Sequence, residues 1–171
     1  VYGFLGSATE GKGYNFLLAS FPERYPLFIG GKPPDRTISE FSKNPNIHRL
    51  GYISPENFFA KITCLIVPSL LYESFGRVVI EAFSAGVPVI ASKSGGLPEI
   101  LKDSLNGFLF EPGSESSLLG AIEKFENLSE EERSRMSERC FQDFQEYFTE
   151  TKMLNSYRSV LSNLEEENRP R

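Results

Sequence analysis

Apolar and polar positions alternate along the chain with two different periods. Six short apolar runs have the length and the aromatic or β-branched content of buried strands, and most of them end at glycine, proline or serine. These runs cover residues 1–5, 26–29, 47–50, 62–67, 88–92 and 106–110. Because segments of helical length separate most of the runs, we predict an α/β fold with one parallel, doubly wound sheet.

Helix-start signals and helical periodicity lie between and after these runs. The predicted helices cover residues 14–20, residues 36–42 after a proline-rich loop, a segment from Pro55 with Ser54 as N-cap, residues 76–85, and one turn within residues 94–99. After residue 110 we predict C-terminal helices with three apolar stripes. The stripes are Leu118, Leu119, Ile122 and Phe125; Met136, Cys140, Phe144 and Phe148, after a capping box at residues 129–132; and Met153, Leu154, Tyr157, Val160, Leu161 and Leu164. We expect these stripes to lie in the core, and docking on a further domain is the alternative for the last helix.

The most informative stretch lies between the fourth apolar run and the helix after it. Pro68 cannot continue a strand, and two carboxylates, Glu73 and Glu81, bracket the turn that follows. The helix is predicted to be buried nearly all round, except along a polar stripe of Arg77, Glu81 and Ser84. Its free N–H groups and the positive end of its dipole lie at the carboxyl end of a buried strand, so a phosphate or pyrophosphate fits there.

Two interpretations of the carboxylate pair stay open at this point. Gly76 permits a close backbone approach to a phosphate, and carboxylates beside a phosphate are best used to accept hydrogen bonds from neutral hydroxyls, such as those of a sugar or ribose. Alternatively, Glu73 merely favours the helix N-terminus, and Glu81 pairs with Arg77 one turn away.

A lysine near the N-terminus precedes a second predicted helix start. The spacing from Gly6 to Gly11 and Lys12 resembles a phosphate-binding P-loop. Such a loop needs serine or threonine after the lysine, where this chain has Gly13, and no apolar run ends in the aspartate that would complete a nucleoside-triphosphatase site. Lys12 is a cation at a helix N-terminus, where only a bound anion makes it favourable. The alternative is an exposed loop lysine that no group holds.

Composition excludes several classes of function. The chain has 171 residues and a net charge of −5, and its lysines and arginines are scattered, which disfavours nucleic-acid binding and a basic membrane-binding face. No apolar run is long enough to span a bilayer. Cys64 and Cys140 have neither a metal-binding spacing nor a disulfide framework, so we expect buried thiols in a reducing compartment. The single histidine, His48, has no second ligand or nucleophile nearby in the sequence, and we predict a structural role for it.

Several motifs occur together in one order. Glu73 and Glu81 form an E-x7-E pattern within P-S-x3-E-S-F-G and E-A-F-S-A-G-V-P-V-I-A-S, followed by G-G-L-P-E. With Lys12 and the N-G-F-L-F-E-P-G segment at residues 106–113, the chain resembles the C-terminal, donor-binding half of the family-four retaining glycosyltransferases of GT-B fold, over essentially its whole length. The resemblance implies a Rossmann-like fold, and it favours the sugar-binding interpretation of the two glutamates.

The resemblance also implies roles by position. Lys12 would neutralise the donor diphosphate together with backbone N–H groups at the helix start, Glu81 would hold the ribose hydroxyls, and Glu73 would orient the transferred sugar. Lys12 and Glu73 are therefore the expected catalytic residues. The residues implied to contact the diphosphate, the ribose and the sugar are Gly6, Ser7, Lys12, Glu73, Ser74, Phe75, Gly76, Arg77, Val78 and Glu81.

Two loops complete the implied site. The loop with Tyr52 and Ile53 would face the nucleobase, and Gly95 and Gly96 would line the cleft. Enzymes of this family resemble one another in needing no metal or cofactor, and their leaving diphosphate is thought to assist the incoming hydroxyl on the same face of the sugar. Stabilising the departing negative charge would then be the main contribution of the protein.

One position departs from the family pattern. Family members usually carry arginine immediately after the first glycine, as a second cation on the diphosphate, and here that residue is Ser7. A lost charge-assisted contact is worth roughly 1.5–3 kcal/mol. Either donor binding is weak or another cation substitutes, and Arg77 is the candidate because it lies on the polar stripe beside the turn.

We therefore expect residues 1–171 to form one nucleotide-sugar-binding domain of a glycosyltransferase of hexosyltransferase type. An N-terminal domain, absent from this sequence, would bind the acceptor, which could be a glycan, a lipid or a small molecule. The expected location is cytoplasmic, with any attachment to the membrane surface through that other half. The alternative is a non-catalytic nucleotide-sugar-binding or partner-binding module, which Ser7 alone suggests; a nucleotide-sugar epimerase is disfavoured by the context of the E-x7-E pattern.

Overall fold

Six parallel strands form one sheet at the centre of the molecule. The computed structural model describes residues 1–32 and 44–167, so the predicted helix at residues 36–42 lies outside the described residues. The strands are β1 (Tyr2–Leu5), β2 (Leu27–Gly30), β3 (Ile47–Gly51), β4 (Cys64–Val67), β5 (Val89–Ser92) and β6 (Gly107–Phe110). Their order is β3-β2-β1-β4-β5-β6, so all six predicted strands and the doubly wound parallel sheet are confirmed.

The strand order reverses between β1 and β4. Tyr2 is paired both with Leu27 of β2 and with Cys64 of β4, so the chain leaves β1 toward one edge of the sheet and later returns to its other side. All four residues of β4 and of β5 are buried, because helices cover both faces of the sheet there. In open α/β sheets, the crevice at such a reversal is where ligands bind.

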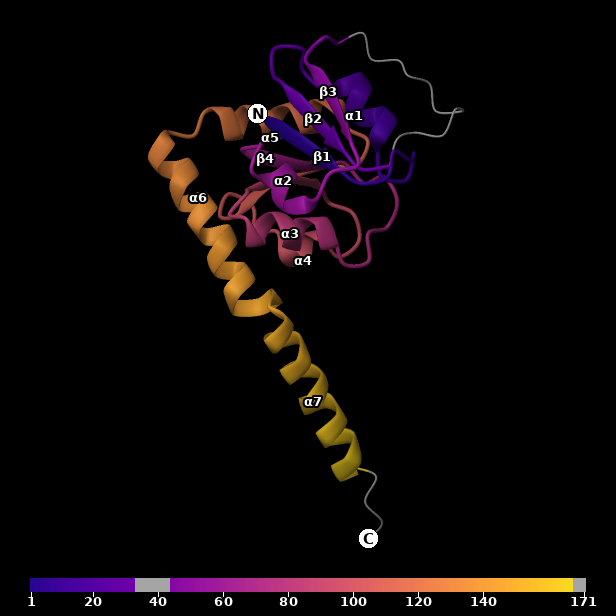
Figure 1. Cartoon of the computed structure of the whole chain (residues 1–171), viewed down its shortest axis with the longest axis vertical. Coiled ribbons are helices and arrows are strands. Elements are labelled where there is room, and N and C mark those ends of the chain that lie inside the picture. Colours follow the sequence, from indigo (N-terminus) through magenta and orange to yellow (C-terminus); the bar gives the residue numbers. More distant parts are fainter. Residues whose placement is uncertain (33–43, 168–171) are drawn as a thin grey trace.

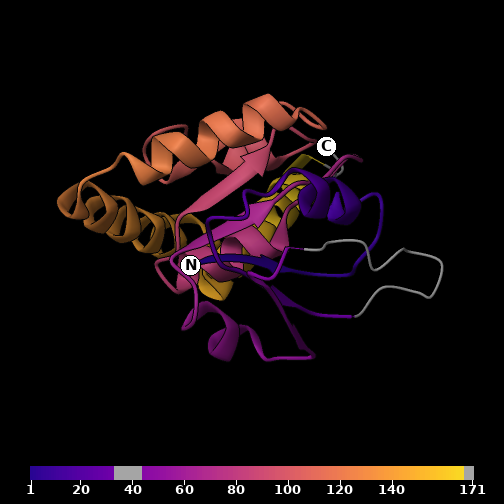
Figure 2. The same cartoon turned by 90° about the horizontal axis from the view of Figure 1, so that it is seen from above.

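Helices cover the two faces of the sheet in separate groups (Figures 1 and 2). The helices are α1 (Tyr14–Ser20), α2 (Pro55–Phe59), α3 (Arg77–Ser84), α4 (Leu97–Ile100), α5 (Glu115–Glu126), α6 (Glu130–Asp143), the π-helix η1 (Phe144–Phe148) and α7 (Glu150–Glu167). One core cluster joins α1 and α5 to the sheet, and the other joins α2, α3 and α4 to the opposite face. Ser54 caps α2 as predicted, and the predicted capping box at the start of α6 is present.

Helix α3 is buried less completely than its sequence predicts. Val79, Ala82 and Phe83 are buried, but Val78 and Ile80 are only partly buried and Ala85 is exposed. The prediction of burial nearly all round is wrong, because α3 packs on β4, α6 and η1 while its remaining side borders a cavity.

The C-terminal helix extends away from the sheet (Figure 1). Five apolar residues on its predicted stripe are 44–65% exposed, namely Met153, Leu154, Tyr157, Val160 and Leu161. The expectation that these five residues lie in the core is therefore wrong, since no part of the described chain covers them; the side chain of Leu164 lies outside the described part of the structure. The alternative, docking on a further domain, stays a prediction. No helix in the described part of the chain is long and apolar enough to cross a membrane.

Both cysteines are free and buried, as predicted. Burial raises the pKa of the Cys64 thiol and of the Cys140 thiol well above the ordinary value, so both stay protonated. His48 is exposed on β3 and meets Phe28 edge to face, and its structural role stays a prediction.

Candidate functional site

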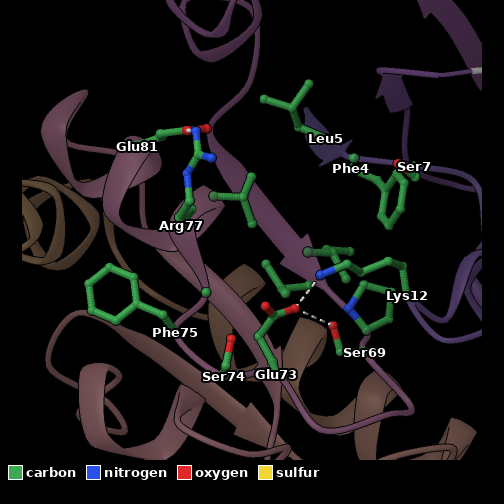
Figure 3. A pocket seen from close by; sticks show the side chains of 16 residues that line it. Phe4, Leu5, Ser7, Lys12, Ser69, Glu73, Ser74, Phe75, Arg77 and Glu81 are labelled. Atoms are coloured by element: carbon green, nitrogen blue, oxygen red, sulfur yellow. Dashed lines mark hydrogen bonds and ion pairs between the residues drawn. The ribbon is translucent and has the colours of Figure 1, made fainter.

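A cavity of about 460 Å³ opens at the carboxyl ends of β1 and β4, where the strand order reverses (Figure 3). It is lined by the last residues of these two strands, by the loops that follow them and by the first turns of α3. The lining residues are Phe4, Leu5, Gly6, Ser7, Lys12, Ile66, Val67, Pro68, Ser69, Glu73, Ser74, Phe75, Gly76, Arg77, Val78 and Glu81. The fold thus brings together every residue predicted to contact the diphosphate, the ribose and the sugar.

Backbone contacts lock the loop after β1 to the loop after β4. The carbonyl of Gly11 accepts hydrogen bonds from the N–H groups of Leu70 at 2.9 Å and Leu71 at 3.2 Å. Gly13 has φ +70°, and a Cβ there would lie 1.8 Å from the carbonyl oxygen of Pro68. Only glycine fits at this position. The two locked loops place Lys12 opposite Glu73.

Lys12 and Glu73 form an ion pair inside the cavity. The Lys12 Nζ contacts Glu73 Oε2, which also accepts a hydrogen bond from the Ser69 hydroxyl at 3.4 Å. The Glu73 side chain is only 15% exposed, whereas that of Lys12 is 46% exposed. The alternative of a loop lysine that no group holds is wrong. Figure 3 shows the two side chains pointing toward one another, with Ser69 beside Glu73.

The N-terminus of α3 borders the cavity without a capping side chain. Its N-cap is Gly76 with φ +71°, no side chain hydrogen-bonds to the first turn, and that turn contains no acidic residue. By contrast, α2, α5 and α6 each begin with a serine that accepts a backbone N–H and have a glutamate in the first turn. The positive end of α3 is therefore open to an anion from the cavity.

Arg77 and Glu81 form a second ion pair at the rim. Their atoms Nη2 and Oε1 lie 3.5 Å apart, one helical turn along α3. The Arg77 side chain is 86% exposed and turns toward Glu81, away from Lys12 (Figure 3). The local pairing that the sequence left open as an alternative is thus present, and Glu81 still lines the cavity.

Gly95 and Gly96 do not line the cavity, which corrects their predicted place. They lie behind the turn and support it: the Gly96 N–H donates to the carbonyl of Glu73 at 2.8 Å, and a Cβ on Gly95 would lie 2.2 Å from that same oxygen. The sequence repeats small residues here because two backbones touch, and no space is left for side chains.

Sequence reasoning missed a set of serines that also hold this turn. Ser92 donates to the carbonyl of Ser69 at 2.7 Å, and Ser94 donates to the carbonyl of Leu71 at 2.6 Å. Both serines are buried; Ser92 ends β5, and Ser94 lies two residues further along the chain. The available signal was their position beside the two glycines, at the carboxyl end of a buried strand.

The loop predicted to face the nucleobase does not line this cavity. Tyr52 is 79% exposed, and Ile53 packs partly against the core, near Gly30. The loop is fixed from the sheet side, since the carbonyl of Gly51 accepts the N–H of Gly31 at 2.8 Å. Its role toward a nucleobase stays a prediction.

Comparison with known proteins gives this site a family. The model of the glycosyl transferases group 1 matches residues 1–143, which include every lining residue of the cavity. The chain belongs to this family. It thus contains a glycosyltransferase domain of the donor-binding type that its motifs resemble.

Individual relatives agree with the family. The chain is 31% identical to N-acetyl-alpha-D-glucosaminyl L-malate synthase of Bacillus anthracis over 139 residues, which is 78% of this chain and 36% of that protein. It is 25% identical to the alpha-1,3/1,6-mannosyltransferase alg-2 of Neurospora crassa over 167 residues, again 36% of that protein. The chain therefore spans about a third of the length of these curated relatives.

Solved structures share the fold of this glycosyltransferase domain. The Anabaena protein HepE, solved in complex with UDP, superposes with a TM-score of 0.83 at 21% identity, over 95% of this chain and 48% of HepE. The C-terminal domain of a glycosyl transferase group 1 family protein from Francisella tularensis superposes with a TM-score of 0.71 at 20% identity, over 87% of this chain and 86% of that domain. The predicted Rossmann-like fold of the GT-B enzymes is confirmed.

Proposed function

We propose that this chain is the donor-binding half of a retaining glycosyltransferase that moves a hexose from a nucleoside-diphosphate sugar to an acceptor hydroxyl. The observation that carries the proposal is the shared cavity, in which Lys12, Glu73, Glu81 and the open N-terminus of α3 meet at the reversal of strand order. Crystal structures of HepE with UDP-glucose and with UDP support a nucleotide-sugar ligand for this fold.

In this proposal the diphosphate lies between Lys12 and the first turn of α3. A cation and oriented N–H groups stabilise the negative charge that grows on the diphosphate as the bond to the sugar breaks. Glu81 accepts hydrogen bonds from the ribose hydroxyls, and Glu73 accepts them from the transferred sugar. A diphosphate oxygen takes the proton of the acceptor hydroxyl on the same face of the sugar. The proposal includes no metal or cofactor.

The acceptor side of the reaction would come from another domain. The chain spans about half of the HepE chain, and the apolar stripe of α7 is exposed. We propose that a further domain docks on α7 and carries the acceptor-binding residues. The 171-residue chain alone should then bind nucleotide but transfer sugar poorly, and a full transfer rate from it would contradict the proposal. The whole enzyme is proposed to act in the cytoplasm.

Calorimetric titration with UDP, GDP and ADP tests donor binding. We expect one of these nucleotides to bind, and Lys12→Ala to weaken that binding roughly 10- to 100-fold, since a charge-assisted contact is worth about 1.5–3 kcal/mol. Glu81→Gln should also weaken it, through the ribose. The matched control is Lys93→Ala, because Lys93 is 49% exposed and pairs with Glu111 at 2.6 Å outside the cavity. Its affinity should equal that of the wild type.

The serine in place of the usual arginine supports a second candidate, a module that has lost catalysis. Absence of binding for all three nucleotides would favour this module and refute the enzyme half. The compensation hypothesis is separate: Ser7→Arg should tighten nucleotide binding, and Arg77→Ala should loosen it, because both side chains line the cavity. Unchanged nucleotide affinity in both variants would refute the hypothesis that Arg77 replaces the missing arginine.

A further inference from the structure

The charged residues of the cavity neutralise one another. Among its sixteen lining residues, the charged ones are Lys12, Glu73, Arg77 and Glu81. They form two pairs, Lys12 with Glu73 and Arg77 with Glu81. The cavity therefore carries no net charge, although the proposed ligand is a polyanion with many hydroxyls.

This pairing conflicts with the roles that donor binding requires. A lysine that holds a diphosphate cannot also keep its ammonium on Glu73, and a carboxylate already bound by that ammonium has less capacity to accept sugar hydroxyls. The conflict is sharpest at Lys12 and Glu73, because Oε2 of this glutamate also accepts a hydrogen bond from the Ser69 hydroxyl.

We propose that the diphosphate exchanges the partner of Lys12: the ammonium leaves Glu73 for the phosphate oxygens, and Glu73 becomes free to accept hydroxyls of the donor sugar. Recognition of the sugar is then conditional on the diphosphate. This inference rests on the proposed donor-binding function and adds to it an order of events within the same cavity.

The surroundings of the two side chains decide which of them moves. Glu73 is 15% exposed, its carbonyl is held by the Gly96 N–H at 2.8 Å, and its carboxylate keeps the Ser69 hydroxyl. Lys12 is 46% exposed and has a long flexible stem, so it can turn toward a ligand at little cost. The exchange leaves the carboxylate in place beside the incoming sugar.

The second pair contributes less to this coupling. Arg77 and Glu81 are separated by 3.5 Å on one helix, and the arginine is 86% exposed. Exposed pairs at this spacing contribute little to stability, because water screens them. Glu81 is thus nearly free to bind ribose, whereas Glu73 is held by Lys12.

A double-mutant cycle on the full 171-residue chain tests the exchange. The variants are Glu73→Gln, Lys12→Met and the double variant, each checked for folding by circular dichroism and titrated with the diphosphate nucleotide that the wild type binds. Glu73→Gln removes the competitor for Lys12, so we expect that nucleotide to bind about threefold tighter, within the range of measured ion-pair energies. In the Lys12→Met background the same change should have no effect.

Two further measurements separate the exchange from simpler charge effects. If Glu73 only repels phosphate, its replacement will tighten binding equally in both backgrounds, and this result overturns the proposal. The matched control is Glu111→Gln, which removes an equivalent paired carboxylate outside the cavity. Tightening by this control as well would show a general effect of the net charge of −5 and would also overturn the exchange.

The conditional part of the proposal is tested with the sugar attached. We expect the wild type to bind at least one of the glucose and N-acetylglucosamine conjugates of its nucleotide more tightly than the nucleotide alone, and Glu73→Gln to abolish that difference. Equal affinities in the wild type overturn conditional recognition. If the wild type binds no nucleotide at all, the proposed function itself fails; if it binds nucleotide and the cycle shows no coupling, only the exchange fails.

Discussion

Gly95 offers a sharp test of how the site is supported, because it never touches the cavity. The residue has φ +58°, and a Cβ would lie 2.2 Å from the carbonyl oxygen and 2.7 Å from the nitrogen of Glu73. Gly95→Ala therefore combines two separate penalties. One is the left-handed backbone conformation, and the other is overlap with the backbone that presents Glu73.

The two penalties can be given magnitudes. The left-handed conformation costs an alanine about 1 kcal/mol, and overpacking against backbone adds about 2 kcal/mol. The free energy of unfolding should fall by about 3 kcal/mol, which lowers Tm by roughly 6–12 °C for a chain of this size. To relieve the overlap, the turn must move by roughly 1 Å. Because such a displacement moves a binding group, we expect the affinity for the donor to fall by up to about 100-fold.

Urea unfolding followed by circular dichroism, with calorimetric titration of the nucleotide sugar, measures both effects. Gly113→Ala isolates the conformational penalty, because Gly113 has φ +70° and its nearest contact for a Cβ would be an ordinary 3.7 Å. Gly120→Ala in α5 meets nothing within 4 Å and should stabilise by about 0.5–1 kcal/mol. If Gly95→Ala destabilises no more than Gly113→Ala, or leaves donor affinity unchanged, the supporting role of Gly95 is refuted.

Three further predictions concern stability and reactivity. Asp143→Ala should lower the free energy of unfolding by about 3 kcal/mol in urea titrations. The carboxylate is 2% exposed, accepts a 2.8 Å hydrogen bond from Asn106 and pairs with Lys102 and Arg139. A loss below about 1 kcal/mol would contradict a structural role. The backbone N–H of Ser129 lowers the pKa of Glu132, so this carboxylate stabilises the fold above its unfolded pKa, and the stabilisation is lost as the pH falls through the folded pKa. Glu132→Ala should therefore lower Tm at neutral pH and have no effect on Tm in acid. An equal change in Tm at both pH values would contradict this linkage. Burial raises the pKa of both Cys64 and Cys140. A thiol reagent should therefore modify neither cysteine in the native protein at pH 8, and both after unfolding. Rapid labelling of the native protein would contradict the burial.

Much of the fold could be predicted because its signals are local. The nearly continuous apolar run at residues 62–67 requires cover on both faces of a strand, and the helix caps at Ser54 and Ser129 need only a serine and its next few residues. Helix α7 shows where local signals end. Its stripe has the period of a packed helix, but a period states which residues share a face and says nothing about what covers that face.

In the candidate site, too, the sequence could propose individual residues but not the contacts between them. Glu73, Glu81 and Lys12 could be proposed as site residues because the order and spacing of their motifs resemble those of a known family. The residues alone left two interpretations of the glutamates open. The pairing of Lys12 with Glu73 joins residues that are 61 positions apart, and no local pattern encodes it. The support of the turn by Gly95 and Gly96 is likewise a contact between two backbones that meet only in the folded chain.

The sequence by itself determined the strands, the caps and the types of group available for binding, because each of these depends on short-range periodicity or on a side chain's own chemistry. The order of its motifs carried the resemblance to the family. Only the tertiary structure decided how those groups are combined. It placed the loops after β1 and β4 together, since the strand order reverses there, and so made one neutral cavity from two cations and two carboxylates. Distances between side chains are set by the packing of the whole sheet and its helices, which is why the partners of Lys12 and Glu73 had to be seen in three dimensions.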